Sequence, residues 1–479
     1  MLCDSRLKSL LFYLAAAIIC MHTLRSSVKA QTELRIGIIG DQTSVDEADV
    51  TSNLAESYKK LDNAVALLRA RHVQIILHTG DLIEDSIAMT ELAYDNIFDK
   101  AAAIIDGSGL PWFLTPGDHD VNPPKDYTFG SPDNTYRQYF QRVYGKRQAA
   151  AKDHLYYSFN FRGFHFIALD SLEHLRTDPR WGDVFLSEIS DEQFEWLKKD
   201  LSAHRQASAI TVFTHQPLWY NWAGWSRVHS LLQEFHVKAV IAGHFHYNQD
   251  EGVLDGIRYL VVGATGADVK QGSKTSGNIH HVTIMTLAKR SPARFALLPL
   301  TAEQAAAFQP RSDMDKVQAL DVMLDNNYYK NYDQFGPSNP LCLIDGTVYS
   351  DSAKSPAQLH LLPIGNPIDQ VVSVSLENMS NAWILEGPGF RIDAKACTQE
   401  SSANTCFLLP GAGIIASNNS SVILPDKGTP MWQTQLKSKS TPVQPDMPVV
   451  LRMRVSFHGQ QGEYMLERKL QTRVSTNCK

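Results

Sequence analysis

Acidic and histidine residues recur in this chain of 479 residues just after short apolar segments. Asp41 and Asp81 each follow a glycine at the end of such a segment, and the run Gly117-Asp118-His119-Asp120 ends a third. His215 and the run Gly243-His244-Phe245-His246 follow two more. Carboxylates and imidazoles are the ligands that hold divalent or trivalent first-row metal ions. The pattern therefore predicts a hydrolytic metal site built from residues far apart in the sequence.

The apolar segments before these residues are predicted strands, and they cover residues 34–39, 73–77, 112–115, 210–213 and 237–241. Apolar residues at helical spacing predict helices over 54–68 and 88–105, the second ended by Gly107. The carboxyl ends of parallel strands in an α/β sheet form a ligand crevice. We therefore expect five strand ends to bring the acidic and histidine side chains together.

The wider pattern predicts two folded parts. Strands and helices alternate up to about residue 300, which is typical of a layered α/β domain. A hairpin is predicted around Arg162-Gly163, with a helix over 194–201 and a strand over 259–262. The sequence becomes polar over 309–340, which we interpret as a linker with a helix predicted at 314–324. Short β-like runs in 341–479, such as 371–376 and 449–455, predict a C-terminal all-β, sandwich-like domain.

The composition describes a globular protein, with 43% hydrophobic and 20% charged residues and a formal net charge of -6. No long basic run occurs, so a nucleic-acid partner is not expected. Residues 1–30 have the layout of a signal peptide, with Arg6 and Lys8 before the apolar run 10–21 and a cleavage site after Ala30. That run is shorter than the roughly 20 residues of a spanning helix. We predict a secreted or periplasmic protein without a stable membrane anchor; a lipid anchor on Cys20 is a less favoured alternative.

Four cysteines lie beyond the predicted signal peptide, and in an exported chain they predict disulfides. Three pairings of Cys342, Cys397, Cys406 and Cys478 are open. Cys397 and Cys406 flank a short polar loop and could join a hairpin. Cys342 and Cys478 would then join the start of the second domain to the end of the chain.

In their order along the chain, the motifs Gly-Asp, Gly-Asp, Gly-Asp-His-Asp, His and Gly-His-x-His resemble the calcineurin-like metallophosphoesterase family, which includes the purple acid phosphatases. The resemblance covers about residues 34–300 and implies a four-layer α/β/α sandwich, which places the catalytic domain at 31–308. It also implies a hydrolase of phosphate mono- or diesters that acts on a small phosphorylated substrate with two metal ions, of Fe, Mn or Zn; the predicted signal peptide makes this an exported hydrolase. Two such ions can lower the pKa of water and supply hydroxide.

The resemblance divides six metal ligands into two groups. Asp81 bridges the two ions, Asp41 and His246 bind the first, and Asp118, His215 and His244 bind the second. His119 corresponds to the histidine that protonates the leaving group as a general acid. Asp120 is expected to orient the His119 ring.

Two departures from the family pattern concern the metals. Thr43 stands where most members have a histidine ligand, and Glu84 stands where purple acid phosphatases have a tyrosine. Glu84, Gln42, Thr43 or water could fill the place. Asp118 stands where the family usually has asparagine, and its charge favours a cation. We predict that the first metal site binds more weakly than the second.

Other candidates have weaker support. Trp219, Trp222 and Arg227 are predicted to contact the substrate, with loop packing as the alternative. His154, His174 and Arg176 are lesser candidates of the same kind, His78, His165 and His236 are predicted to be structural, and Gly182-Asp183 follows no strand. The competing function is a metal-binding or interaction module with little or no catalysis, which Thr43 favours and the pair His119 and Asp120 opposes.

Overall fold

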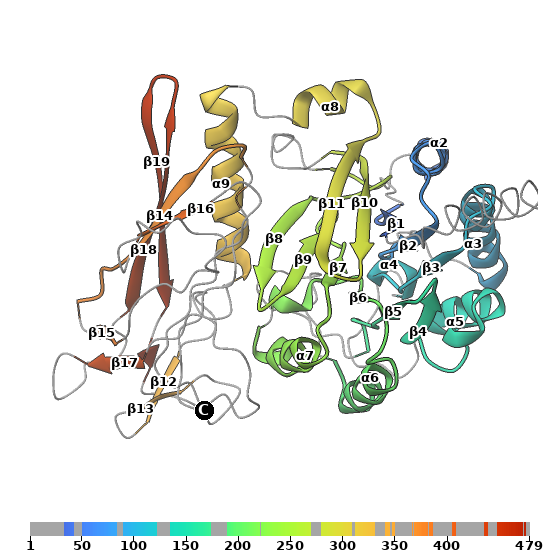
Figure 1. Cartoon of the computed structure of the whole chain (residues 1–479), viewed down its shortest axis with the longest axis horizontal. Coiled ribbons are helices and arrows are strands. Elements are labelled where there is room, and N and C mark those ends of the chain that lie inside the picture. The colour runs from blue at the N-terminus through green and yellow to red at the C-terminus, as the bar shows by residue number, and fades with distance from the viewer. Residues whose placement is uncertain are drawn as a thin grey trace, which may run out of the picture.

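A computed structural model describes residues 33–42, 50–83, 90–121, 135–173, 189–220, 222–269, 279–308, 312–330, 341–344, 347–349, 366, 368–381, 383–386, 405–408, 435–438, 448–472 and 474–475. Two sheets with flanking helices form the larger part, and a β-rich part with one long helix lies beside it (Figure 1).

The first sheet has five strands in the order β11-β10-β1-β2-β3. Its strands are β1 (Glu33–Ile39), β2 (Ile75–His78), β3 (Trp112–Leu114), β10 (His281–Ala288) and β11 (Ser291–Pro299). β1, β2 and β3 run parallel, with Ile36 opposite Ile75 and Ile76 opposite Trp112. Because they are parallel, their carboxyl ends lie at one edge of the sheet.

The second sheet has six strands in the order β4-β5-β6-β7-β9-β8. Its strands are β4 (Tyr157–Phe161), β5 (Phe164–Ala168), β6 (Ile210–Phe213), β7 (Ala239–Ala242), β8 (Gln249–Leu254) and β9 (Ile257–Val261). β5, β6, β7 and β9 are parallel, while β4 and β8 pair antiparallel at the two edges. The hairpin predicted around Arg162-Gly163 is β4-β5.

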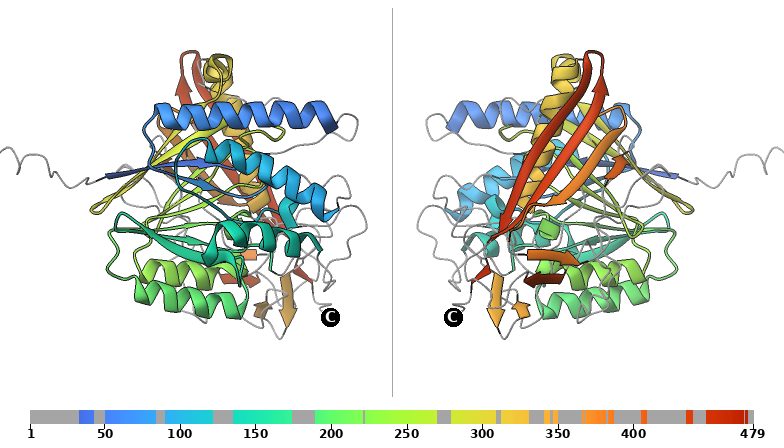
Figure 2. Two further views of the ribbon diagram at one scale, coloured as in Figure 1. Left: turned by 90° about the vertical axis from the view of Figure 1, so that its right-hand side faces the viewer. Right: turned by 90° about the vertical axis from the view of Figure 1, so that its left-hand side faces the viewer.

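Helices cover the outer face of each sheet. The helices are α2 (Val50–Ala70), α3 (Glu91–Asp106), α4 (Asp118–Val121), α5 (Thr135–Arg147), α6 (Asp191–Ala203) and α7 (Trp222–Glu234), with short 3-10 turns η1 (Ala149–Ala151) and η2 (Leu218–Tyr220). Figure 2 shows α2 and α3 in blue on one side of the sheets and α6 and α7 in green on the other. Leu197 and Leu232 of the green helices pack with Val212 of the second sheet. This arrangement confirms the predicted four-layer α/β sandwich.

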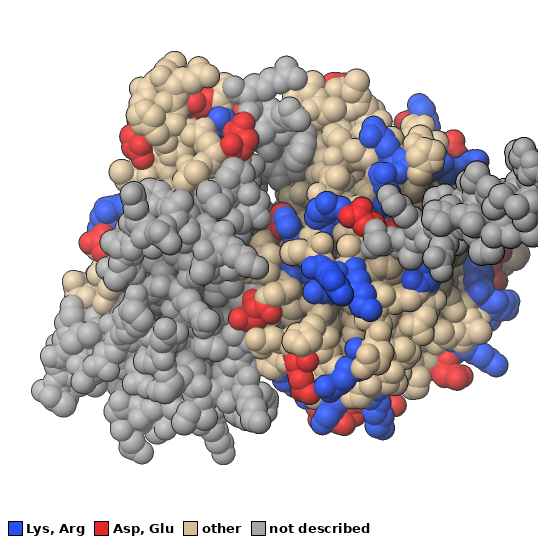
Figure 3. Space-filling view, in the orientation of Figure 1, with Lys and Arg blue, Asp and Glu red and all other residues tan. Residues whose placement is uncertain are grey.

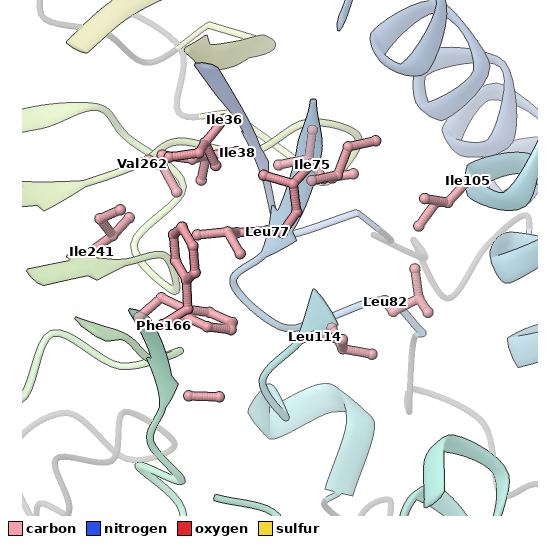
Figure 4. Close-up of a cluster of buried hydrophobic side chains, with 14 of the residues drawn as sticks. Ile36, Ile38, Ile75, Leu77, Leu82, Ile105, Leu114, Phe166, Ile241 and Val262 are labelled. Atoms are coloured by element: carbon pink, nitrogen blue, oxygen red, sulfur yellow. The ribbon is translucent and has the colours of Figure 1, made fainter. Parts of the chain in front are cut away.

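The two sheets pack face to face. Ile38 and Leu77 from the first sheet and Phe166 and Ile241 from the second lie close together in one buried core (Figure 4). Removing apolar side chains from water is the main favourable contribution to folding. The core fixes the two sheets against each other, and with them the strand ends that carry the acidic and histidine residues.

The C-terminal part is built from β-strands, as predicted. A four-stranded antiparallel sheet has the order β16-β14-β18-β19, beside a three-stranded sheet β13-β12-β20 and the pair β15-β17. These strands are β12 (Leu341–Ile344), β13 (Thr347–Tyr349), β14 (Val372–Asn378), β15 (Trp383–Glu386), β16 (Thr405–Leu408), β17 (Gln435–Ser438), β18 (Val449–Gly459), β19 (Gly462–Thr472) and β20 (Val474–Ser475).

Two helices, α8 (Ala302–Phe308) and α9 (Asp313–Lys330), connect the parts. The predicted linker thus contains a helix longer than the expected 314–324. α9 contacts β19, where Arg468 Nη2 lies 2.5 Å from Asp321 Oδ1. This segment therefore packs on the C-terminal sheet in addition to connecting the two parts.

Several predictions fall outside the described residues. These are the signal peptide 1–30, Thr43, Glu84, His174, Arg176, Gly182-Asp183, Cys397 and Cys478. Cys342 lies opposite Ser475 in the β12-β20 pair, near the end of the chain, but its pairing with Cys478 stays a prediction. Within the described part of the chain, no helix is both long and apolar enough to cross a bilayer.

Candidate metal centre

Five loops bring the predicted ligands to one place. Asp41, Asp81 and Asp118 follow β1, β2 and β3, which are neighbours in the first sheet. His215 and His244 follow β6 and β7, which are neighbours in the second. The loops bond to each other through the backbone: Asp41 N donates to Gly80 O, and Gly243 N donates to His215 O. The carboxyl ends of both sheets thus form the crevice that the sequence predicts.

Asp118, His215 and His244 form a compact group. Asp118 Oδ1 lies 2.6 Å from His215 Nε2 and 2.9 Å from His244 Nδ1. The two ring nitrogens are 3.2 Å apart. Three ligand atoms around one point, two of them imidazole nitrogens, are a donor set suited to a first-row metal ion.

A second group shares His215 with the first. One ligand atom each of Asp41, Asp81 and His215 lie within 4.8 Å of one another. Asp81 Oδ2 is 3.3 Å from His215 Nε2, so Asp81 lies between the two groups. His246 Nε2 is 3.7 Å from Asp41 Oδ1, a longer separation than any within the compact group. The structure thus brings together all six residues predicted as ligands.

Backbone carbonyls orient two of the rings. His215 Nδ1 donates to Thr79 O at 2.8 Å, and His246 Nδ1 donates to Asp268 O at 2.8 Å. A carbonyl oxygen only accepts, so each Nδ1 carries the proton and each Nε2 is directed to the carboxylates. Histidine ligands of metals are held in this way, because the outer hydrogen bond fixes the tautomer and the ring plane.

The backbone of the site adopts conformations that are uncommon for residues with a Cβ. Asp41, Asp81, His244 and His246 have φ values of 48°, 56°, 73° and 56°. Left-handed conformations of this kind cost free energy and concentrate at functional sites. Gly117 has no room for a side chain, since a Cβ there would overlap the Asp81 carboxylate. Packing against the two sheets holds these loops in place.

The site holds buried carboxylates whose negative charge a bound cation would offset. Burial raises the pKa of Asp81 well above its ordinary value, an effect that the neighbouring His215 opposes. Burial also opposes protonation of His215, but Asp81 and Asp118 outweigh it and raise the pKa of His215 to about 10. Asp41 Oδ2 is buried and has no hydrogen-bond partner. Metal ions would neutralise these carboxylates and replace the proton on His215.

Asp120 has contacts other than those predicted. Its carboxylate accepts hydrogen bonds from the backbone N–H groups of Asp81, Leu82, Ile83 and Gly117, at 2.8 to 3.0 Å. These four bonds join the loops after β2 and β3, so Asp120 holds the loop that carries Asp81. They give no support to the prediction that Asp120 orients the His119 ring. The buried Asp120 carboxylate is satisfied by these four backbone donors and needs no bond from an imidazole.

His119 lies at the rim of the site. Its backbone N–H donates to Asp81 Oδ1 at 3.0 Å, and its Nε2 is 4.0 Å from Asp118 Oδ2. The side chain of His119 is 37% exposed, whereas that of Asp118 is 10% exposed. The ring therefore lies beside the ligands and remains open to an incoming molecule.

Two of the residues predicted to contact the substrate, Trp219 and Arg227, have other partners in the structure. Trp219 is 3% exposed and packs in the outer core, with its ring 5.0 Å from that of Tyr259. Arg227 bonds Asp191 Oδ1 at 2.5 Å and Ile189 O at 2.6 Å, at the start of α6. Trp219 thus packs in the core beneath α6 and α7, and Arg227 joins α7 to the start of α6. Trp222 lies in α7, and its side chain is outside the description.

One buried acidic residue near a strand end, Asp170, was not singled out from the sequence. Asp170 directly follows the strand that ends at Ala168, is fully buried, and pairs with Arg137. The rule that found Asp41 would have found it. Gln42, considered as a metal ligand, donates from Nε2 to Ser57 O at 2.7 Å and Ser57 Oγ at 2.9 Å, which fastens the first loop to α2. Its Oε1 is buried without a hydrogen-bond partner, so its role as a ligand stays a prediction.

Comparisons with known proteins agree with this geometry. Residues 34–248 match the sequence model of a family described as calcineurin-like phosphoesterase. The chain is similar to the uncharacterized protein YvnB of Bacillus subtilis, with 26% identity over 41% of this chain and 15% of that protein. It is also similar to purple acid phosphatase 15 of Arabidopsis thaliana, with 27% identity over 33% of this chain and 30% of that protein.

Among solved structures, a dimetal phosphatase from Danio rerio aligns with a TM-score of 0.40 and 17% identity, over 56% of this chain and 96% of that one. The chain spans less than a third of the length of the two relatives above.

Proposed function

We propose that this chain, whose residues 34–248 match the calcineurin-like phosphoesterase family, is an exported hydrolase that cleaves phosphate esters with two metal ions. The observation that carries the proposal is the convergence of three carboxylates and three imidazoles from five strand ends. The similarity to a protein named purple acid phosphatase supports the same chemistry. We place the catalytic unit at 31–308 and the C-terminal β part at 341–479.

The residues fit two ions. Asp118, His215 and His244 would hold one, Asp41 and His246 the other, and Asp81, which lies between the groups, would bridge them. The fit rests on the donor set, on the buried Asp41 oxygen without a partner, and on the carbonyl bonds that direct two rings inward. When bound, a pair of such ions lowers the pKa of water toward about 7 and stabilises charge on the phosphoryl group.

His119 is proposed as the general acid. Its ring lies at the rim of the site, half-exposed, with Nε2 close to the Asp118 carboxylate. In its protonated form the imidazole can donate a proton to the departing alkoxide oxygen. Its backbone bond to Asp81 Oδ1 fixes the position of the ring relative to the bridging carboxylate.

The substrate is proposed to be a small phosphorylated molecule, with a monoester favoured over a diester. The face in Figure 3 shows Lys and Arg interspersed with Asp and Glu over the catalytic part. A nucleic-acid backbone needs a concentrated basic stripe, and that described face carries no such stripe. Secretion or transfer to the periplasm follows from the predicted signal peptide.

The alternative is a metal-binding module without turnover, which the Thr43 position favours. Metal binding alone does not require an exposed imidazole beside the ligands. The position of His119 therefore favours catalysis.

The test is phosphate release by the metal-stripped protein after addition of Mn²⁺, Zn²⁺ or Fe²⁺, with aryl and alkyl monoesters and one aryl diester. We expect activity that depends on metal. In His119→Ala, the rate with the alkyl ester should fall by about 10²- to 10⁴-fold, because its alkoxide leaves only with a proton. The loss with a nitrophenyl ester should be smaller.

His236→Asn serves as the control, since His236 is exposed at the end of α7 and asparagine tolerates its φ of 55°. Equal losses in His119→Ala with both leaving groups would refute the role of general acid. Metal binding without hydrolysis of any of these esters would establish the alternative.

A further inference from the structure

A second group of metal-binding side chains lies away from the crevice, at the other end of β5. His165 is near the start of β5, whereas Asp170, which follows this strand, is at its crevice end. At about 3.3 Å per residue, the two positions are roughly 15 Å apart along the strand. Asp200 and His204, at the end of α6, complete the group. The group is therefore separate from the proposed catalytic ions.

The alternation of side chains along β5 explains how His165 meets α6. Phe164 and Phe166 point into the core between the sheets, and Ile167 belongs to the outer core under α6 and α7. Because neighbouring side chains in a strand point to opposite faces, His165 lies on the outer face with Ile167. α6 covers this face of the second sheet (Figure 1).

The ligand atoms are close together. His165 Nε2 lies 2.7 Å from Asp200 Oδ2, and His204 Nδ1 lies 3.3 Å from Asp200 Oδ1. One ligand atom from each of the three residues lies within 4.8 Å of the others. The two rings stack with centroids 3.8 Å apart, so both imidazoles lie on the same side of the carboxylate. His204 Nδ1 also donates to the backbone oxygen of Asp200 at 2.9 Å. The His204 ring must rotate out of this bond, and Asp200 must rotate slightly, before the three side chains can bind one ion.

Neighbouring polar groups hold two of these side chains as they do in metal sites. Asn160 is the cross-strand partner of His165, and its Oδ1 accepts from His165 Nδ1 at 2.9 Å. His165 Nε2 is directed at the Asp200 carboxylate, where either a proton or a metal ion can lie between the two groups. Ser158 Oγ donates to Asp200 Oδ1 at 2.6 Å and orients that carboxylate. Such outer hydrogen bonds tune and fix metal ligands.

The surroundings favour a cation. The group lies at the C-terminus of α6, where His204 is the cap, and a helix C-terminus carries partial negative charge. His165 is fully buried, but the His204 side chain is 29% exposed and gives access from solvent.

From this geometry we infer that His165, Asp200 and His204 form a site for a divalent first-row ion, with Zn²⁺ as the best fit. Two imidazoles and one carboxylate leave the fourth position of a tetrahedral ion to water. The bound ion joins the start of β5 to the end of α6 and stabilises the outer layer of the domain.

The test is equilibrium dialysis of the full chain against Zn²⁺, followed by elemental analysis, in the wild-type background and in an Asp81→Asn background that weakens the crevice ions. His204→Phe keeps a ring stacked on His165 but removes the ligand. Asp200→Asn keeps a hydrogen-bonding side chain but removes the charge. We expect each variant to bind one ion fewer per chain in both backgrounds. His236→Asn, the matched exposed histidine after α7, should bind as many ions as its parent.

An unchanged ion content in His204→Phe and Asp200→Asn would overturn the inference, and the three residues would then be a hydrogen-bonded packing group. The same loss in His236→Asn would also overturn it, since it would indicate general binding by exposed histidines. The measurement does not depend on catalysis, so failure of the proposed hydrolysis would leave it interpretable.

Discussion

The two halves of the crevice differ in how tightly their ligands are gathered. Asp118, His215 and His244 have contacts between 2.6 and 3.2 Å, while His246 is 3.7 Å from Asp41. The compact half has two imidazoles on one carboxylate. The looser half has one imidazole, and Thr43 stands where the family pattern has a second. From this difference we expect the second metal site to have more side-chain ligands than the first.

The two halves are expected to differ in their affinity for metal ions. Both halves are carried by strand ends of the same two sheets, which share one core. What differs is the number of side-chain donors. Affinity should therefore follow ligand count, and the looser half should lose its ion first when metal is removed.

The largest effect on the rate of phosphate release is expected from a change at Asp81, which lies between the two halves. Asp81→Asn removes the charge shared by both ions, and metal ions contribute several kcal/mol of transition-state stabilisation. The rate of phosphate release should fall by about 10³-fold or more, since each 1.36 kcal/mol is tenfold. Steady-state kinetics at saturating Mn²⁺ would measure it. A loss below tenfold would mean that Asp81 is not shared.

His244→Ala removes a ligand from the compact half only, and His246→Ala removes one from the looser half only. Calorimetric titration of the stripped wild-type protein with Mn²⁺ should show two affinities at least about tenfold apart, since even supporting contacts of a metal site are worth about 10- to 100-fold. His244→Ala should abolish the tighter phase, and His246→Ala should abolish the weaker one. Two equally tight phases in the wild-type protein would contradict the difference between the halves.

A smaller effect is expected from Asp120, which supports the loop carrying the shared ligand. Asp120→Asn replaces a carboxylate by a side chain with one acceptor, so some of the four backbone donors lose their partner. We expect an unfolding free energy lower by about 1–3 kcal/mol and Mn²⁺ affinity weaker by about 10- to 100-fold. Denaturant unfolding with and without metal would separate these effects. Unchanged metal affinity would limit Asp120 to a role in folding.

The sequence predicted the strand ends correctly because each signal was local: an apolar run followed by an acid or histidine, with a glycine between them at all but His215. It did not predict the partners of Asp120 or Arg227, because bonds to backbone groups and to another helix leave no pattern in the chain. Trp219 was considered as a crevice residue, yet it packs with Trp225 of α7 in the outer core. Trp225, His229 and Leu232 have helical spacing, so the helix itself could have been predicted.

The central claim, that six side chains from five loops hold a pair of ions, is tested most directly by anomalous diffraction from crystals loaded with Mn²⁺. The account predicts two anomalous peaks about 3.5–4 Å apart, one beside Asp118 and His244, one beside Asp41 and His246, with Asp81 between them. A single peak, or two peaks too far apart to share Asp81, would contradict it.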